Sequence, residues 1–544
     1  MKVGNYFKEA FVYDLKAGFI TAVVALPLAL AFAIASGVPP IMGLYTAVIA
    51  GILGSGLAGS PYSITGPTGA MTVIILSTVS KFGLEGLLVA GLLAGIFQII
   101  MGVVKLGRLV KYIPFPIVSG FTAGIGAIIF IGQIANSLGL SLPAKEHVWQ
   151  TISQIINNLS GVQITAITIA IATVLALVFL PRYLVKIPIV KFFPASFFAL
   201  VGSTLIAYIF SLPIPLVGDI PSGFPAFHLF NINFELIKAV TPAAFTIALL
   251  GAIEALLCAV VCDSMTNTRH KSDKELISQG VCNTLLPFFG AIPCTAAIAR
   301  SAVNIREGAK TRGAGIIHGI ILLIIILFLV PIAKFIPKAF LAGILMFVSA
   351  RMINLHEFKT VERVNKSDTF VLLVTFLLTV FTDLVFAVEV GMFLAVFLLF
   401  IRLTKIAGIS AMEDYKPNSG LNKLVYSSKK MKELVSVYTL HGPFFFGAMG
   451  IFEKKISEQM ETAKPVIILR MKHVTFIDST GVVQLVEFIK HRQKNKRLVL
   501  LTGLEPKVKE VLLRNHEFRT HLKPEQMFTH TTQAVNFIQR KYTL

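Results

Sequence analysis

Two ionisable residues, Glu254 and Arg300, stand in stretches of the sequence that are otherwise apolar or small. Glu254 lies within Thr246–Cys258, and Arg300 lies six residues after Cys294. A charge inside a membrane-crossing stretch is costly unless it is paired or solvated, so such residues mark functional sites. If both line one cavity, Arg300 offers a fixed positive charge to an anion and Glu254 a titratable site for a proton. The alternative is a structural Glu254–Arg300 ion pair that locks two helices.

Two short polar segments, Ser63–Thr72 and Gly290–Arg300, interrupt the apolar pattern in the same way. Each has a proline, Pro67 or Pro293, followed by a threonine and small residues. Seven predicted spans separate them, so the second is inserted upside down, and matching broken helices in inverted repeats mark a transporter's binding site. We expect each proline at the first position of a half-helix, with both positive helix ends facing an anion. The alternative is a pair of kinked but ordinary spans.

The elements that position these segments are predicted to be membrane spans. The chain has 544 residues, of which 55% are hydrophobic and 14% charged, with a mean hydropathy of +0.78. Soluble proteins carry about 25% charged residues. Apolar stretches of about 20 residues, long enough to cross a bilayer, recur from Leu15 to Leu403. We predict a transmembrane domain at 1–410, a linker at 411–431 and a soluble domain at 432–544.

The formal net charge of +21 does not indicate nucleic-acid binding, because the basic residues between the predicted spans lie mainly in the connections on one side of the membrane. With fourteen spans and an inside N-terminus, the predicted outer connections hold only Lys81, Lys145, Lys238, Lys334 and Lys338. The predicted inner connections hold Lys105, Arg108, Lys111, Arg182, Lys186, Lys191, Arg269, Lys271, Lys274, Arg306, Lys310, Arg312, Arg351, Lys359, Arg363 and Lys366. This positive-inside bias predicts a multi-pass protein of the inner (plasma) membrane, with its N-terminus and C-terminal domain in the cytoplasm.

The C-terminal part alternates between strand and helix patterns. Leu434–Leu440, Val466–Met471 and Arg497–Leu501 are predicted to be buried strands, and Thr480–Lys494 and Lys507–Asn515 to be helices. These elements predict a small α/β domain.

Several longer motifs resemble the sulfate permease (SulP) family of anion transporters across nearly the whole chain. They are Ala25–Phe32 with Gly37–Pro40, Gly66–Gly69, Glu275–Gly280 and Ala299–Asn304. The C-terminal part is similar to a STAS domain, and Ile477–Gly481 matches the phosphoacceptor turn of that family. Ser479 is therefore a candidate phosphorylation site and the domain a candidate docking site for a protein partner. Asp478 and Ser479 are also ordinary helix-capping residues.

The resemblance implies an all-α polytopic membrane protein of fourteen spans in a 7+7 inverted repeat. The repeat is divided into a core and a gate domain that move like an elevator, followed by the cytoplasmic α/β STAS domain, in a homodimer. It also implies a substrate pocket formed by the first, third, eighth and tenth spans. In this chain the corresponding residues are Leu26, Phe32, Thr68, Gly69, Glu254, Ala296, Ala297, Ile298 and Arg300.

Two positions depart from the pattern of sodium-coupled bicarbonate members of the family. The pattern of those members is similar to that of this chain but has threonines at the positions of Cys258 and Ile298, and an aspartate at the position of Glu254. A thiol and an alkyl group are poor ligands for a hard cation that prefers oxygen. Proton coupling through Glu254, or plain anion exchange, is therefore favoured over sodium coupling.

The leading hypothesis is a secondary active transporter of a small inorganic anion, sulfate first, by proton symport or by exchange. Bicarbonate or a C4-dicarboxylate is the alternative substrate. A membrane sensor that signals through the STAS domain and an anion channel are the alternative classes. The sequence contains no nucleotide-binding loop, catalytic triad or CxxC spacing. We therefore predict no enzyme activity, no cofactor and no metal site; the partners are an anion, a proton and the lipid bilayer.

Overall fold

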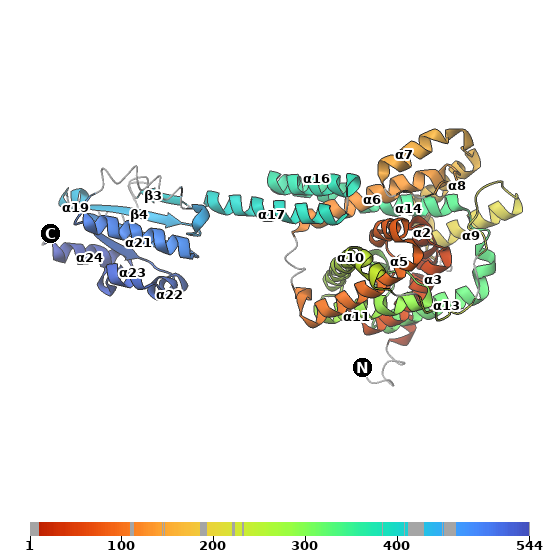
Figure 1. The fold of residues 1–544 in the computed structure, drawn as a ribbon, viewed down its shortest axis with the longest axis horizontal. Coiled ribbons are helices and arrows are strands. Elements are labelled where there is room, and N and C mark those ends of the chain that lie inside the picture. Colours follow the sequence, from red (N-terminus) through yellow and green to blue (C-terminus); the bar gives the residue numbers. More distant parts are fainter. Residues whose placement is uncertain are drawn as a thin grey trace. The chain divides into compact units, whose positions relative to one another are not determined.

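The computed structural model describes residues 10–108, 114–143, 145, 147–184, 186, 193–219, 223–230, 233–382, 384–406, 408–411, 429–448, 450 and 464–542. The chain divides into two compact units, Met1–Met392 and Phe393–Leu544. We call them the membrane unit and the C-terminal unit (Figure 1).

The membrane unit is built from helices. Eight helices of the described chain are long and apolar enough to cross a membrane, and two shorter apolar helices accompany them. In chain order the described helices are α2 (Phe11–Ala35), α3 (Pro40–Ile49), η1 (Ala50–Gly54), α4 (Ser55–Leu57), α5 (Gly69–Val103), η2 (Leu106–Arg108), α6 (Phe115–Ser137), α7 (Val148–Asn157), η4 (Leu159–Gly161), α8 (Ile164–Leu184), α9 (Ala195–Ile209), α10 (Phe234–Thr266), α11 (Ser272–Leu285), η6 (Leu286–Phe289), α12 (Ile298–Arg306), α13 (Gly313–Ala333), α14 (Lys338–Met352), α15 (Leu355–Val364), α16 (Lys366–Phe381) and α17 (Leu384–Ile406). Helix α17 continues into the C-terminal unit.

Helix α5 is two segments joined at Gly83, which has φ 71° and ψ −173°. Glycine adopts this conformation without the clash that a side chain would cause. With α5 counted twice and α3 to α4 counted as one segment, these helices match the fourteen predicted spans, α7 and α15 being connections. The prediction of a polytopic helical membrane fold with a 7+7 repeat is confirmed.

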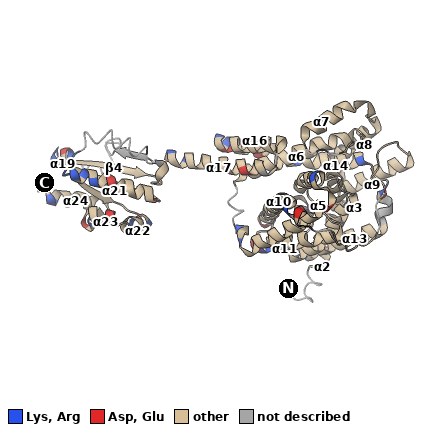
Figure 2. Cartoon of the chain, in the orientation of Figure 1, with Lys and Arg blue, Asp and Glu red and all other residues tan. Residues whose placement is uncertain are grey.

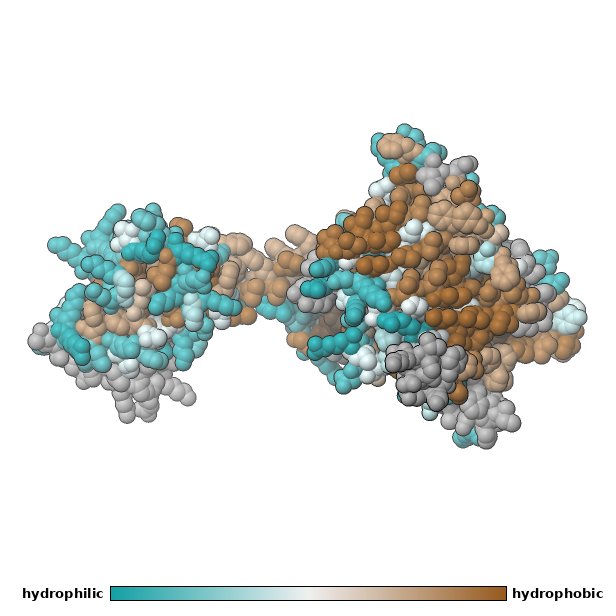
Figure 3. Space-filling model, turned by 90° about the horizontal axis from the view of Figure 1, so that it is seen from below, coloured by the Kyte–Doolittle hydropathy of each residue, from teal (hydrophilic) through white to brown (hydrophobic). Residues whose placement is uncertain are grey.

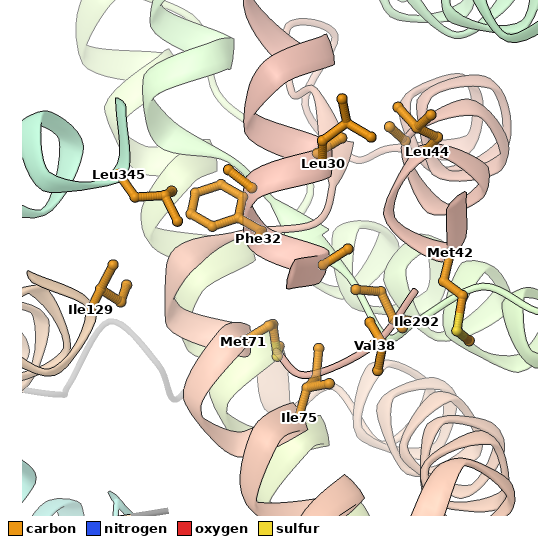
Figure 4. Close-up of a cluster of buried hydrophobic side chains, with 14 of the residues drawn as sticks. Leu30, Phe32, Val38, Met42, Leu44, Met71, Ile75, Ile129, Ile292 and Leu345 are labelled. Atoms are coloured by element: carbon orange, nitrogen blue, oxygen red, sulfur yellow. The ribbon is translucent and has the colours of Figure 1, made fainter. Parts of the chain in front are cut away.

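Small residues allow the helices of the membrane unit to pack closely. An ideal Cβ on Gly95 of α5 would lie 2.7 Å from the carbonyl oxygen of Gly280 in α11, and one on Gly280 would lie 2.7 Å from the carbonyl oxygen of Gly95. Because lipid removes the hydrophobic drive between helices, such close backbone contact supplies much of the association energy. Larger side chains fill the remaining core, where Phe32 of α2 points toward Leu345 and Ile129 (Figure 4).

The surface of the membrane unit is apolar over a broad area. On α8, Ile171, Leu175 and Val178 are 54%, 50% and 40% exposed. Figure 2 shows few charged residues among the helices of this unit, and the face seen in Figure 3 is largely hydrophobic. Such a surface is stable only when acyl chains or another apolar partner cover it.

The C-terminal unit contains a five-stranded sheet. Its strand order is β3 (Gly408–Ala411), β4 (Val435–His441), β5 (Val466–His473), β6 (Leu498–Thr502) and β7 (Met527–Phe528). β3 pairs antiparallel with β4, and the other neighbours are parallel. The helices are α19 (Lys429–Leu434), α21 (Ser479–Lys494), α22 (Pro506–Arg514), α23 (His516–His521) and α24 (Thr531–Lys541).

Helices cover both faces of this sheet. Ile467 and Leu469 of β5 pack in one apolar cluster with α21, α22 and α23, whereas Val466 and Ile468 pack in another with α24. Side chains alternate between the two faces of a strand, so a strand buried on both faces is an unbroken apolar run. The predicted strands and helices of this domain are present, within two residues at each end.

One strand comes from an unexpected part of the chain. β3 lies at the predicted border between the transmembrane domain and the linker. It forms the edge of the sheet, antiparallel to β4. Most of the predicted linker, 412–428, lies outside the described residues.

Asp478 caps α21, as one of the two interpretations of Ile477–Gly481 predicts. Its Oδ1 accepts a hydrogen bond from the Gly481 N–H at 2.7 Å, and its Oδ2 accepts one from the Phe446 N–H at 3.1 Å. An N-cap of this kind is worth about 1 kcal/mol. Ser479 is exposed at the first position of the helix, where a phosphate would meet the positive helix end. Its phosphorylation stays a prediction.

Candidate anion-binding site

The two polar segments that break the apolar pattern meet in the centre of the membrane unit. Strand β1 (Thr65–Gly66) pairs antiparallel with β2 (Thr295–Ala296), with Thr65 opposite Ala296 and Gly66 opposite Thr295. A helix follows each strand almost at once, α5 from Gly69 and α12 from Ile298. The short sheet therefore places two helix N-termini beside each other.

The predicted position of the two prolines is wrong. Pro67 stands two residues before α5, and Pro293 stands five residues before α12, so neither is the first residue of its helix. The chain must stay extended around β1 and β2 for the strands to pair, and proline suits extended backbone as well as it suits a helix start. Pro67 instead contributes its carbonyl oxygen to the site, as described below.

Neither half-helix is capped by a side chain. Thr68 precedes α5 and accepts no hydrogen bond from the first-turn amides, and Ala297, which precedes α12, has no side-chain acceptor. The threonine hydroxyl, which could have capped α5, donates a hydrogen bond to Glu254 Oε2 at 2.9 Å. Uncapped first-turn N–H groups and the helix dipole together attract anions.

Arg300 supplies a fixed positive charge at this point. Its side chain is buried, and Nη2 donates a hydrogen bond to the carbonyl oxygen of Pro67 at 2.7 Å. The other terminal nitrogen, Nη1, is buried without a hydrogen-bond partner among the described residues. An ideal Cβ on Gly66 would lie 2.7 Å from Nη1, so the guanidinium lies directly against β1. A buried donor without a partner costs about 1–3 kcal/mol, which an acceptor on a bound anion would remove.

Glu254 approaches the same segment from α10. It lines a cavity of about 70 Å³ together with Ala70 of α5 and Ile298 of α12. No nitrogen of Arg300 lies within 4.0 Å of a Glu254 oxygen in the described structure; instead the two side chains bond to adjacent residues, Pro67 and Thr68. The alternative of a direct Glu254–Arg300 ion pair is therefore not formed in this conformation.

Buried polar side chains hold the strands in place. Asn283 of α11 accepts a hydrogen bond from the Cys294 N–H at 2.8 Å and donates one to the Cys294 carbonyl at 3.0 Å. Gln279 Nε2 donates to Thr65 Oγ1 at 3.1 Å, and Ser301 Oγ accepts from the Ile64 N–H at 2.9 Å. Irregular backbone in a membrane needs such partners, because no water replaces them.

The segment before β1 has a further acidic anchor, Glu275. This carboxylate is fully buried in α11, and its Oε2 accepts hydrogen bonds from the N–H groups of Gly59 and Ser60 at 2.6 and 2.9 Å. Glu275, Gln279 and Asn283 are not among the site residues predicted from the sequence. Burying a polar side chain is costly, and this cost identified Glu254 as a candidate. The same cost could have indicated that Glu275, Gln279 and Asn283 need hydrogen-bond partners.

Two cavities lie near the start of α5, one lined in part by Ala70 and the other in part by Thr72. The small cavity with Glu254 includes Ile125 of α6, and a second cavity of about 500 Å³ includes Ile129, one helical turn further. An ideal Cβ on Gly69 would lie 3.0 Å from the Ile129 side chain and 3.4 Å from the Phe32 ring. Phe32 and Ile129 thus lie against the start of α5.

Most of the predicted site residues come together here. Phe32, Thr68, Gly69 and Ile298 adjoin the helix ends or the cavity with Glu254, while Ala296 and Ala297 lie in β2 and at the start of α12. Leu26 is an exception: it lies six residues before Phe32 on α2, about 9 Å along the axis, and does not line the cavity. Cys258 is fully buried and donates to Ser301 Oγ at 3.2 Å.

Comparison with known proteins agrees with this architecture. The family model described as "Sulfate permease family" matches residues 11–375, and the STAS domain model matches 426–534. The chain belongs to the sulfate permease family. One relative is "Putative sulfate transporter YvdB" of Bacillus subtilis. It is 36% identical over 515 residues, which cover 93% of this chain and 94% of the relative. "Bicarbonate transporter BicA" of Picosynechococcus is 34% identical and covers 80% of this chain and 78% of its own length.

Solved structures of the sulfate permease family fold match as well. The transmembrane domain of a cyanobacterial bicarbonate transporter BicA has a TM-score of 0.63 at 34% identity and covers 71% of this chain and 97% of its own. The overall structure of SLC26A9 has a TM-score of 0.84 and covers 98% of this chain and 91% of its own. At 20% identity the latter supports the fold alone.

The contact between Gly66 and Arg300 gives a prediction for the site. Gly66→Ala places a methyl group where Nη1 now lies, so the guanidinium must move away from β1. Loss of one charge-assisted hydrogen bond to an anion lowers affinity by about tenfold or more. Anion-dependent thermal stabilisation of the purified protein measures this.

Gly202→Ala in α9 is the matched control, because an added Cβ there meets nothing within 4 Å. Equal anion affinity in Gly66→Ala and Gly202→Ala would contradict the placement of the anion at Arg300.

Proposed function

We propose that this protein is a secondary active transporter of a small inorganic anion. The observation that carries the proposal is Arg300, a buried guanidinium with an unpartnered Nη1 beside two uncapped helix N-termini. Three sources of positive potential converge there. An anion bound between them completes the hydrogen bonding of Arg300 and of the first-turn amides.

The substrate that we favour is an oxyanion, with sulfate first and bicarbonate second. The cavity beside Glu254 has a volume of about 70 Å³, about twice the volume of a water molecule in the liquid. Arg300 is not among the residues that line this cavity, so its volume does not select among these anions. The relatives named for sulfate and for bicarbonate transport support both oxyanions.

Coupling to protons would use Glu254. An anion at Arg300 and an ionised Glu254 repel each other, and a proton on the carboxyl group removes that repulsion. Each of the two bindings therefore favours the other, by the same factor in both directions. Sodium coupling is disfavoured, because Cys258 and Ile298 offer no oxygen from their side chains to a hard cation.

Transport would require the site to open to the two cavities in turn. We expect Phe32 of α2 and Ile129 of α6, which lie against Gly69 at the start of α5, to belong to the barrier that must open. A displacement of the helices that hold β1 and β2 along α6 would bring the anion from one cavity to the other. This is the elevator movement expected for the family. We place the N-terminus and the STAS domain in the cytoplasm, in a homodimer of the inner membrane.

Arg300→Ala should abolish anion binding while the protein remains folded. The substitution removes the fixed charge and leaves the two helix ends as the only attractors, so we expect anion affinity to fall by at least about 100-fold. Anion-dependent thermal stabilisation, measured with sulfate and bicarbonate, is the readout. Arg306→Ala is the control, because Arg306 is exposed on the same helix, α12. Unchanged stabilisation in Arg300→Ala would refute the assignment.

Glu254→Gln should separate anion exchange from proton coupling. The amide mimics the protonated carboxyl group, so the variant should bind the anion and exchange it across the membrane. It should lose, by at least about tenfold, the uphill accumulation that an inward proton gradient drives. Flux of labelled anion into proteoliposomes under imposed pH and sodium gradients measures both activities.

Glu235→Gln, which changes an exposed carboxylate in the first turn of the same helix, is the control. Undiminished proton-driven accumulation in Glu254→Gln, or a sodium requirement in the unmodified protein, would refute the coupling mechanism. Single-channel currents instead of saturable flux would assign a channel, and anion binding without any flux would assign a sensor.

A further inference from the structure

Helices α6, α8 and α14 enclose an apolar groove on the membrane unit, and its lining shares no residue with that of the cavity beside Glu254. The volume of the groove is about 540 Å³. Its walls are apolar side chains such as Phe130 of α6, Val174 and Val178 of α8 and Met346 of α14. Because α8 is a candidate membrane span with an exposed apolar face, the groove opens toward lipid.

One charged residue, Arg351, lines this groove among the described residues. It is exposed in the last turn of α14, and its guanidinium carbon lies 4.3 Å from the centroid of the Phe347 ring. No carboxylate oxygen of the described chain lies within 4.0 Å of it, since Arg351 is in none of the ion pairs found there. The stacking on Phe347 orients the side chain but leaves its charge uncompensated.

The position of Arg351 along the chain sets its depth. It is followed by the short helix α15, which carries Glu357, Lys359, Glu362 and Arg363. A helix with this many charges belongs at the polar boundary of a bilayer. Arg351 therefore lies near that boundary, at one end of the groove, whereas Ile167 and Ile171 of α8 extend the groove toward the opposite end of the helix.

We propose that the groove binds an anionic phospholipid, with the phosphate paired to Arg351 and an acyl chain lying along α6 and α8. An uncompensated guanidinium on a lipid-facing surface is costly, and a phosphate at the boundary is the anion that a bilayer supplies there. The guanidinium presents a fork of donors that fits two phosphate oxygens. The apolar walls fit a chain without polar groups. The proposal does not depend on which anion the protein transports.

The test measures lipid retention by the purified full-length protein. Native mass spectrometry after exposure to phosphatidylglycerol or phosphatidylcholine of identical acyl chains counts the bound lipids. We expect phosphatidylglycerol to be retained in preference, and Arg351→Ala to reduce its retention by about fivefold or more. Arg351→Lys should keep part of it, because a point charge remains without the fork of donors.

Two further variants make the outcome specific. Val174→Trp fills the groove and should reduce retention of phosphatidylglycerol with Arg351 still present. Arg363→Ala removes an exposed arginine of α15 outside the groove and should leave retention unchanged. Equal retention in Arg351→Ala, or an equal loss in Arg363→Ala, would overturn the proposal. A changed oligomeric state of Arg351→Ala with unchanged lipid retention would assign the groove to contact between copies of the chain.

Discussion

The site depends on one constraint: a bilayer offers no water to backbone groups that a broken helix leaves unpaired. A single broken span would expose several N–H and C=O groups at a cost of several kcal/mol each. Two broken spans can satisfy part of this need together, and here they do so by the antiparallel pairing of β1 and β2. Asn283 bonds to both backbone groups of Cys294, and Ser301 accepts a hydrogen bond from the Ile64 N–H. Gln279 donates one to the Thr65 hydroxyl.

Donors that an anion could use are among the groups that remain unsatisfied. The first-turn amides of α5 and α12 have no side-chain cap, and Nη1 of Arg300 has no partner in the described part of the chain. Glu254 stands across Thr68 from this site instead of neutralising Arg300 directly. The arrangement keeps the positive charge available and holds a carboxyl group close enough to respond when an anion arrives.

Two kinds of sequence signal predicted parts of the structure: a long run of apolar residues, and a single charged residue whose burial is costly. The apolar spans, the paired breaks around Pro67 and Pro293, and Glu254 and Arg300 were accessible in this way, as were the strands of the C-terminal domain. The exact start of each half-helix was not, because proline suits both an extended segment and a first helical turn, and the choice was decided by pairing between distant strands. The contacts of Gln279 and Asn283 were also out of reach, since they join residues far apart in sequence. The role of β3 depends on pairing with a strand beyond 412–428, which no local pattern in Gly408–Ala411 could indicate.

The central claim is that the anion sits between the N-termini of α5 and α12, in contact with Arg300. The most direct measurement is a crystallographic structure of the protein with selenate or bromide, whose anomalous signal locates the anion. We predict one strong peak within hydrogen-bonding distance of Arg300 Nη1 and of a first-turn amide of α5 or α12. A peak elsewhere in the membrane unit, such as beside Lys338 in the 500 Å³ cavity, with none at Arg300, would contradict it.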